Sequence, residues 1–234
     1  MEQAAPKQRS PWLYVLLGCG GFAALSCLGV AIFFGVVVKK GSDMVAGVTD
    51  PRVREENARK MLGELPVGYS VAMSMSMLGM VDTALLTDAP TLADGGFEIG
   101  DHLFTYLRVM ANDENKRTKA FFVSGDGDAS HLRSNGVNID ARDVIKRGNL
   151  TVDGRKIYYV AARGQFGTGT QQTAEEGLNA SVLFDCPGEQ LHVGAWSMRD
   201  PSPEKPAGEL ELTGTVADES ELAKFLKPMN PCGR

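Results

Sequence analysis

The longest uncharged segment of the chain lies near its N-terminus. The 27 residues from Trp12 to Val38 contain no Asp, Glu, Lys or Arg and are mostly Leu, Val, Ala, Phe and Gly. A bilayer core about 30 Å thick is crossed by about 20 helical residues, so this segment can span it with some tilt. An aromatic pair opens the segment and Lys39-Lys40 follows it, as is typical of span ends. We therefore predict a single transmembrane helix over 12–38, after a short polar tail over 1–11.

A lipoprotein signal is the alternative interpretation of this segment. Leu16-Leu17-Gly18-Cys19 resembles a cleavage box, but the apolar run before it is short for a signal core. Apolar sequence also continues as far as Val38, where a lipidated cysteine would be followed by a polar tether. A second box, ending at Cys27, has Ala24 in place of the branched residue expected there. An uncleaved span is the better prediction.

Small residues recur every fourth position of the predicted span and would form one stripe on a helix. Such stripes let two helices pack closely, which raises the hypothesis of a homodimer; single spans are also rich in Gly and Ala for other reasons. The stripe comprises Cys19, Ala23, Cys27, Ala31 and Gly35. The first predicted partner of the chain is thus the bilayer, and the second is another copy of the chain.

The net charge of −5 is divided unevenly along the chain. Residues 1–40 carry +3, so residues 41–234 carry −8. Neutralising phosphates requires clustered Lys and Arg, so an acidic domain without a basic stripe is a poor partner for nucleic acid or anionic lipid. We predict no nucleic-acid partner.

The remaining chain is predicted to be an α+β domain over 51–234, joined to the span by a linker over 39–50. Asp50-Pro51 should begin a helix that ends at Gly63, and Asp218 should begin a second helix that stops before Pro228. Between these flanking helices the signals are mostly strands separated by short turns, which favour a mainly antiparallel sheet with helices on one face.

Alternating residues and turn signals predict the individual strands. Asp153-Gly154 predicts the clearest hairpin, because a tight turn needs positive φ. The expected strands are 71–77, 83–86, 97–110 (one strand or two), 150–152, 156–162, 179–184 and 191–196. We also expect 119–123 to return as a hairpin partner, 140–147 to form a short helix, and 209–213 to form a last strand.

Met73-Ser74-Met75-Ser76-Met77 is the most unusual local pattern in the chain. Thioether sulfur selects Cu(I), so a copper-binding module is one hypothesis. The alternative is a strand whose methionine face packs on the core, where Met fills irregular gaps. No His or Cys lies nearby in sequence to complete a copper site.

Other patterns give no catalytic, cofactor or metal site. His102, His131 and His192 have no metal-ligand spacing, and no nucleophile motif is present. The glycine-rich stretch 164–176 lacks the Lys-Ser/Thr of a phosphate loop and favours a mobile loop, which is the best candidate for binding a ligand or partner. The residues of this predicted binding loop are Gly164, Phe166, Gly167 and Gly169.

Cys186 and Cys232 are the cysteines outside the predicted span. A disulfide between them would tie the C-terminal tail to the sheet and would place the domain in an oxidising compartment; two free thiols are the alternative. Positive residues beside the span slightly favour a cytoplasmic C-terminal domain, but long domains translocate largely regardless of such charges. We therefore expect a cell-membrane protein with an extracytoplasmic domain.

The sequence supports three hypotheses about function. The favoured one is a single-pass membrane-anchored protein with a non-catalytic domain that binds or scaffolds a partner protein. The alternatives are a membrane-anchored hydrolase-type enzyme with a site assembled from scattered residues, and a Cu(I)-binding module that uses Met73, Met75 and Met77.

Overall fold

The computed structural model of the protein describes residues 50–77, 80–92, 96–110, 112–125, 143–166 and 175–233. These residues form three α-helices, one short 3₁₀-helix and seven strands. Their bounds are α2 (Pro51–Leu62), β1 (Ser70–Met77), β2 (Val81–Thr87), β3 (His102–Met110), α3 (Asp113–Val123), β4 (Asp143–Val152), β5 (Arg155–Phe166), β6 (Glu175–Phe184), β7 (Gln190–Arg199), η2 (Ala207–Glu209) and α4 (Glu219–Leu226).

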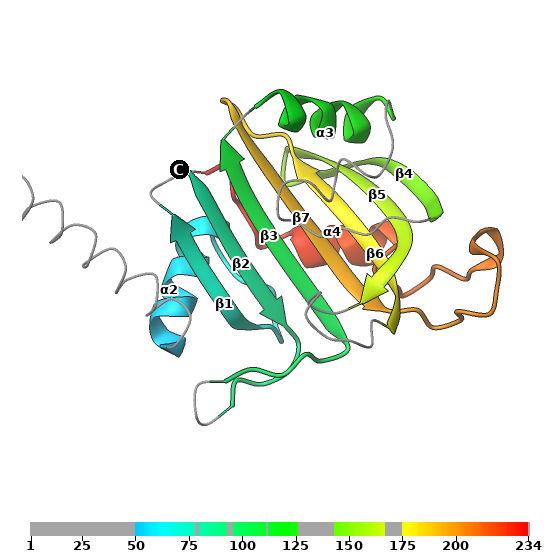
Figure 1. Ribbon diagram of the computed structural model, residues 1–234, viewed down its shortest axis with the longest axis horizontal. Helices are drawn as coiled ribbons and strands as arrows, with labels where there is room; N and C mark the ends of the chain where they lie inside the picture. Colours follow the sequence, from blue (N-terminus) through cyan, green and yellow to red (C-terminus); the bar gives the residue numbers. More distant parts are fainter. Residues whose placement is uncertain are drawn as a thin grey trace, which may run out of the picture. The chain divides into compact units, whose positions relative to one another are not determined.

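All seven strands belong to one antiparallel sheet with the order β1-β2-β3-β7-β6-β5-β4 (Figure 1). The sheet consists of two meanders, β1 to β3 and β4 to β7, and each is built by pairing neighbours in the sequence. The last strands of the two meanders, β3 and β7, pair in the middle of the sheet, with Tyr106 opposite Gly194. This central pair brings together residues that are far apart in the sequence.

The larger core lies on the face of the sheet that α2 and α4 cover. Phe104 and Tyr106 of β3 point to this face, where they are buried with Leu62 of α2 and with Leu222 and Phe225 of α4. The helices therefore each bury one apolar stripe against the sheet, as the α+β prediction requires. Figure 1 shows α4 running across the middle strands on this side.

A second core lies on the opposite face beneath α3. The alternate residues of β3, Leu107 and Val109, are buried there with Phe121 and Phe122 of α3. Strand β3 thus contributes side chains to both cores, because successive side chains of a strand point to opposite faces. The expectation that helices cover one face is met by α2 and α4, and α3 adds a helix on the other.

The structure confirms the α+β class of the described domain and the helix boundaries that capping residues predict. Asp50 accepts a hydrogen bond from the backbone N–H of Arg52 at the start of α2, and Asp218 accepts one from Ser220 at the start of α4. The Asp153-Gly154 turn joins β4 to β5 with positive φ at both residues. The predicted pairing of the strands around 179–184 and 191–196 is β6 with β7.

Three local predictions were wrong. Residues 119–123 belong to helix α3: Thr118, Phe121 and Phe122 are buried at helical spacing, whereas the short aromatic run alone resembles a strand. From position 143 on, the expected helix is instead β4, an edge strand that is mostly exposed and so lacks clear alternation. Residues 209–213 form no strand: Glu209 ends η2, and Leu210 and Leu212 pack on the larger core without a strand partner.

The prediction of a membrane-spanning helix falls on residues that the structure does not describe. Within the described part of the chain, no helix combines the length and the apolar character that a span requires. The helix over 12–38 therefore stays a prediction of the sequence.

Candidate functional site

A cleft of about 650 Å³ lies where the turn after α2 faces the C-terminal end of α4. The hairpin turn at Asp153 and strand β7 complete its walls. Its floor is aromatic and its rim carries charges of both signs. The lining residues are Glu64, Pro66, Val67, Tyr69, Asp153, Trp196, Glu221, Lys224, Phe225, Lys227 and Pro228.

The floor of the cleft is a cluster of three aromatic side chains. Trp196 of β7 stacks flat on Phe225 of α4, with ring centroids 4.2 Å apart. The indole Nε1 donates a hydrogen bond to the Tyr69 hydroxyl over 2.8 Å, and Tyr69 meets Phe225 edge-on at 5.0 Å. Burial raises the pKa of Tyr69 to about 12, with a further contribution from nearby Asp88, so the phenol stays neutral at neutral pH. The floor is therefore rigid and apolar, with a single hydroxyl held in place.

Asp88 and His102 form a paired acid and imidazole beside this floor. Asp88 directly follows β2 and His102 begins β3, so the β2–β3 pairing places them side by side. Asp88 Oδ2 lies 2.9 Å from His102 Nδ1, while Oδ1 accepts the His102 backbone N–H over 3.0 Å. The His102 ring also lies 5.8 Å from the Trp196 ring. A carboxylate at Nδ1 favours the tautomer in which Nε2 is free to accept a proton.

A nucleophile for this pair is not found among the described residues. The side chain of His102 hydrogen-bonds there to Asp88 and to no hydroxyl or thiol. Nucleophilic catalysis needs such a group within hydrogen-bond reach of the base. The pair is therefore an oriented imidazole that contacts the Trp196 ring of the floor, and neither of its residues lines the cleft.

The turn at 66–69 forms an exposed apolar tip between the cleft and a second hollow. Tyr69 N–H bonds to the Pro66 carbonyl over 3.2 Å, and Gly68 has φ of 86°, which a type II turn requires at that position. Val67 is fully exposed at the tip. The second hollow, of about 430 Å³, lies between this turn and α2 and shares Pro66, Val67 and Tyr69 with the cleft.

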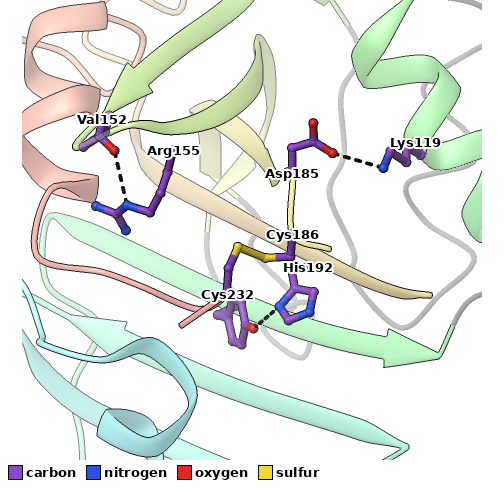
Figure 2. The surroundings of a disulfide bond; sticks show 8 residues. Lys119, Val152, Arg155, Asp185, Cys186, His192 and Cys232 are labelled. Atoms are coloured by element: carbon purple, nitrogen blue, oxygen red, sulfur yellow. Dashed lines mark hydrogen bonds and ion pairs between the residues drawn. A yellow bond between two sulfur atoms is a disulfide. The ribbon is translucent and has the colours of Figure 1, made fainter. Parts of the chain in front are cut away.

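A disulfide fixes the C-terminal wall of the cleft. Cys186, just after β6, is bonded to Cys232, and their Cα atoms are 5.1 Å apart (Figure 2). The bond closes a chain segment that contains α4, Lys227 and Pro228, all of which contribute to the cleft. Arg155 donates a further hydrogen bond to the Lys227 carbonyl over 3.0 Å. The predicted Cys186–Cys232 bridge is thus confirmed, and it fixes the C-terminal wall of the cleft as well as the C-terminal tail.

Polar side chains are buried on the same face of the sheet, next to the disulfide. His192 lies beside the bridge in Figure 2, and its Nδ1 is 2.9 Å from the Tyr106 hydroxyl. Asp82 is 1% exposed and pairs with Arg108, and it also accepts a hydrogen bond from Ser76 over 2.5 Å. Burial and the nearby Arg108 charge lower the pKa of His192 to about 4, so the imidazole is neutral at neutral pH. This cluster has its own partners, which is typical of a structural network.

The other predicted site residues are placed only in part. The stripe of Cys19, Ala23, Cys27, Ala31 and Gly35 lies outside the described residues, as do Gly167 and Gly169 of the predicted binding loop. Gly164 and Phe166 lie within strand β5, and Phe166 is buried. The strand therefore continues further into the glycine-rich stretch than the sequence predicted, and the role of the loop stays a prediction.

The methionine strand is β1, as predicted. Met73, Met75 and Met77 share one side of the strand, and their exposure increases toward Met77, which is 40% exposed. In the described ranges, His, Cys, Asp and Glu side chains form no group of three or more that could hold a metal ion. The Cu(I) hypothesis depends on thioethers alone, and it too stays a prediction.

Sequence reasoning missed the aromatic floor and the Asp88–His102 pair. Tyr69, Trp196 and Phe225 lie on three elements separated by long stretches of chain, so their approach requires the sheet order. The one sequence signal near this floor is the turn that ends in Tyr69, because a proline and a glycine before an aromatic residue are typical of a tight turn.

No protein-family model matches the chain, and no curated protein matches it in sequence.

Proposed function

We propose that this protein is a single-pass membrane-anchored binding protein whose domain captures an apolar segment of a partner protein. The aromatic cleft beside α4 is the observation that carries this proposal. Apolar pockets with a few fixed polar groups are the usual sites of binding, and aromatic anchors dominate the energy of protein interfaces. A rim with both acidic and basic side chains suits the polar ends of a peptide.

A protein partner is favoured over a small molecule by the exposed tip at Val67. A fully exposed branched side chain stands between two hollows, so a partner that covers the tip can fill both hollows at once. A small molecule in one hollow would leave this side chain in water. A single exposed apolar side chain is common on protein surfaces, and it is the position of Val67 between the two hollows that favours a protein partner.

The anchor and the location of the domain belong to the same proposal. The span over 12–38 would hold the domain at the cell membrane, and its small-residue stripe would let two spans associate. The Cys186–Cys232 bond supports an extracytoplasmic domain, because disulfides persist in oxidising compartments.

A peptide selection on the full chain in phospholipid nanodiscs tests the proposal. Displayed random peptides should yield binders that share an apolar anchor, and Val67→Asp should weaken their binding at least about tenfold, since it puts a charge at the centre of the interface. Val123→Asp is the matched control, because Val123 is an exposed valine on α3 at the opposite face. Binders that do not distinguish V67D from wild type, or a selection without binders, would contradict the proposal.

A hydrolase-type enzyme is the second candidate, and the Asp88–His102 pair is the observation that favours it. An imidazole oriented by a carboxylate is a standard component of a general base. Wild type and His102→Gln in nanodiscs should be compared with chromogenic ester and peptide substrates. Turnover that falls at least about a hundredfold in H102Q would support the enzyme over the binding protein.

A further inference from the structure

The two edges of the sheet differ in how they are protected. The edge strand β4 carries Asp143, Lys146 and Arg147, and its register shifts between Val144 and Lys146. Charges and bulges are the devices by which edge strands avoid pairing with another chain. The other edge strand, β1, contains no charged residue and no proline. Its irregularity lies near its start, between Val71 and Met73, so Met73–Met77 pairs regularly with β2.

The outer side of β1 is available in the described structure. The sheet order ends at β1, and no described strand pairs with its outer edge. Helix α2 packs on one face of the strand, where Arg54 donates a hydrogen bond to the Ala72 carbonyl. Beyond that contact, Ser76 and Met77 are exposed and Met75 is half-buried. Within the regular half, Ser74 is buried and Met73 is half-buried, so the accessible part of this edge is Met75–Met77.

The sequence of this half is a palindrome. Met-Ser-Met-Ser-Met reads the same in both directions about Met75. When two identical strands pair antiparallel around a twofold axis, each residue faces its mirror position across the axis residue. An axis at Met75 therefore places Met73 opposite Met77 and Ser74 opposite Ser76, with like residues on the same face.

We propose that β1 pairs antiparallel with β1 of a second copy of this chain, with Met75 on the twofold axis. The sheet then continues from one copy into the other, and methionines from both copies meet on one face, where flexible thioethers pack readily. A neutral edge lets the two copies approach without like-charge repulsion. With this palindrome, a second copy sets Met opposite Met and Ser opposite Ser at every position of 73–77, which favours the second copy as the occupant.

Cysteine cross-linking tests this register in the full chain in nanodiscs, with Cys19 and Cys27 changed to alanine. Opposed Cα atoms in an antiparallel pair are about 4.5–5.5 Å apart, within the range that a disulfide spans. Met75→Cys should therefore give a covalent dimer on oxidation. Met73→Cys and Met77→Cys should each give none alone, because like positions lie about 13 Å apart, but a mixture of the two should cross-link.

Thr151→Cys on the charged edge strand β4 is the control and should not cross-link. If M73C or T151C cross-links as well as M75C, the cross-links report random collision and the proposal fails. Cross-linking centred on a residue other than Met75 would overturn the proposed pairing register.

A charge on the axis tests the same pairing without cysteines. Met75→Lys places two ammonium groups opposite each other, and should weaken dimerisation in detergent at least about tenfold by analytical ultracentrifugation. Met80→Lys is the control, because Met80 is exposed in the turn after β1 and lies outside the pairing. A dimer that survives M75K but is lost in Ala31→Leu/Gly35→Leu would assign dimerisation to the span and overturn the proposal, as would a monomeric wild type.

The cross-linking arm does not depend on the stability of M75K, and the thermal midpoint of M75K shows whether it is folded. A peptide partner at this edge would instead leave the chain monomeric. The proposal does not rest on the cleft, so V67D should leave dimerisation unchanged.

Discussion

The indole of Trp196 and the ring of Phe225 lie nearly parallel, at 3° and with centroids 4.2 Å apart, and this contact joins β7 to α4. Both rings are largely buried, and Phe225 also meets Phe104 and Tyr69 edge-on. A single side chain of α4 thus contacts aromatic rings from β3, β7 and the turn before β1. The floor of the cleft and the larger core are therefore one packed unit.

Phe225→Ala should cost about 3 kcal/mol of unfolding free energy, because it removes a buried ring that contacts three others. Chemical denaturation monitored by circular dichroism measures the loss. Phe97→Ala is the matched control, since Phe97 is 40% exposed and should change stability little. Equal effects of the two substitutions would show that Phe225 is not held as described.

Removing the disulfide should both destabilise the domain and loosen the wall of the cleft. Cys186 and Cys232 are 46 positions apart, so Cys232→Ser should cost about 4 kcal/mol in the chain-entropy account of cross-links. Urea unfolding with and without reductant measures the effect. In the Cys186→Ser/Cys232→Ser variant the reductant should have no further effect, and a reductant response there would implicate other cysteines.

Stability should fall with acid through His192. The pKa of His192 is about 4 in the folded chain, below its ordinary value of 6.5, so between these values the unfolded chain binds a proton that the folded chain does not. The contribution of neutral His192 to folding stability is therefore full above about pH 6.5. It is lost as the pH falls toward 4, by at most about 3 kcal/mol. Urea midpoints across this pH range should show a shallower slope in His192→Gln than in wild type. Parallel slopes would contradict the assignment.

Arg163 should be the main support of the loop after β7. Its Nε lies 2.7 Å from Asp200 Oδ2, whose side chain is fully buried, and its Nη2 donates to the Ser202 carbonyl over 2.8 Å. Arg163→Met would leave the Asp200 carboxylate buried without its partner, at a cost of about 3 kcal/mol. Hydrogen exchange should quicken at 200–206. Arg59→Met, which breaks an exposed pair with Glu55, should change neither quantity appreciably.

Short sequence patterns predicted the helix starts and the hairpin turn, because these features depend on neighbouring residues alone. Asp50 and Asp218 begin their helices because a carboxylate can accept free N–H groups there, and Asp153-Gly154 turns because both residues tolerate positive φ. α3 was missed because its apolar stripe is short and its first turns are highly charged. β4 was missed because an edge strand need not alternate.

The candidate site depended on information that local signals do not contain. The sequence could offer Cys186 and Cys232 as a pair, since the predicted span accounts for the other two cysteines, but it left two free thiols as the alternative. Asp88 and His102 meet because β2 pairs with β3, and Trp196 joins them only because β3 pairs with β7, a pairing that neither strand indicates. A sheet order of two meanders is one of several that the same strands allow, so the cleft could not be placed from the sequence.

The pairing of β3 with β7 also sets the order in which this chain can fold. Tyr106 and His192 are 86 positions apart, so the first meander stays without its neighbour until most of the chain has been synthesised. Long-range strand pairs of this kind form slowly, typically in milliseconds to seconds. During synthesis β3 is a temporary edge until β7 emerges, and α4, which follows β7 in the chain, packs on the sheet after that. The Cys186–Cys232 bond, made by the last cysteine to emerge, then secures a sheet that is already assembled.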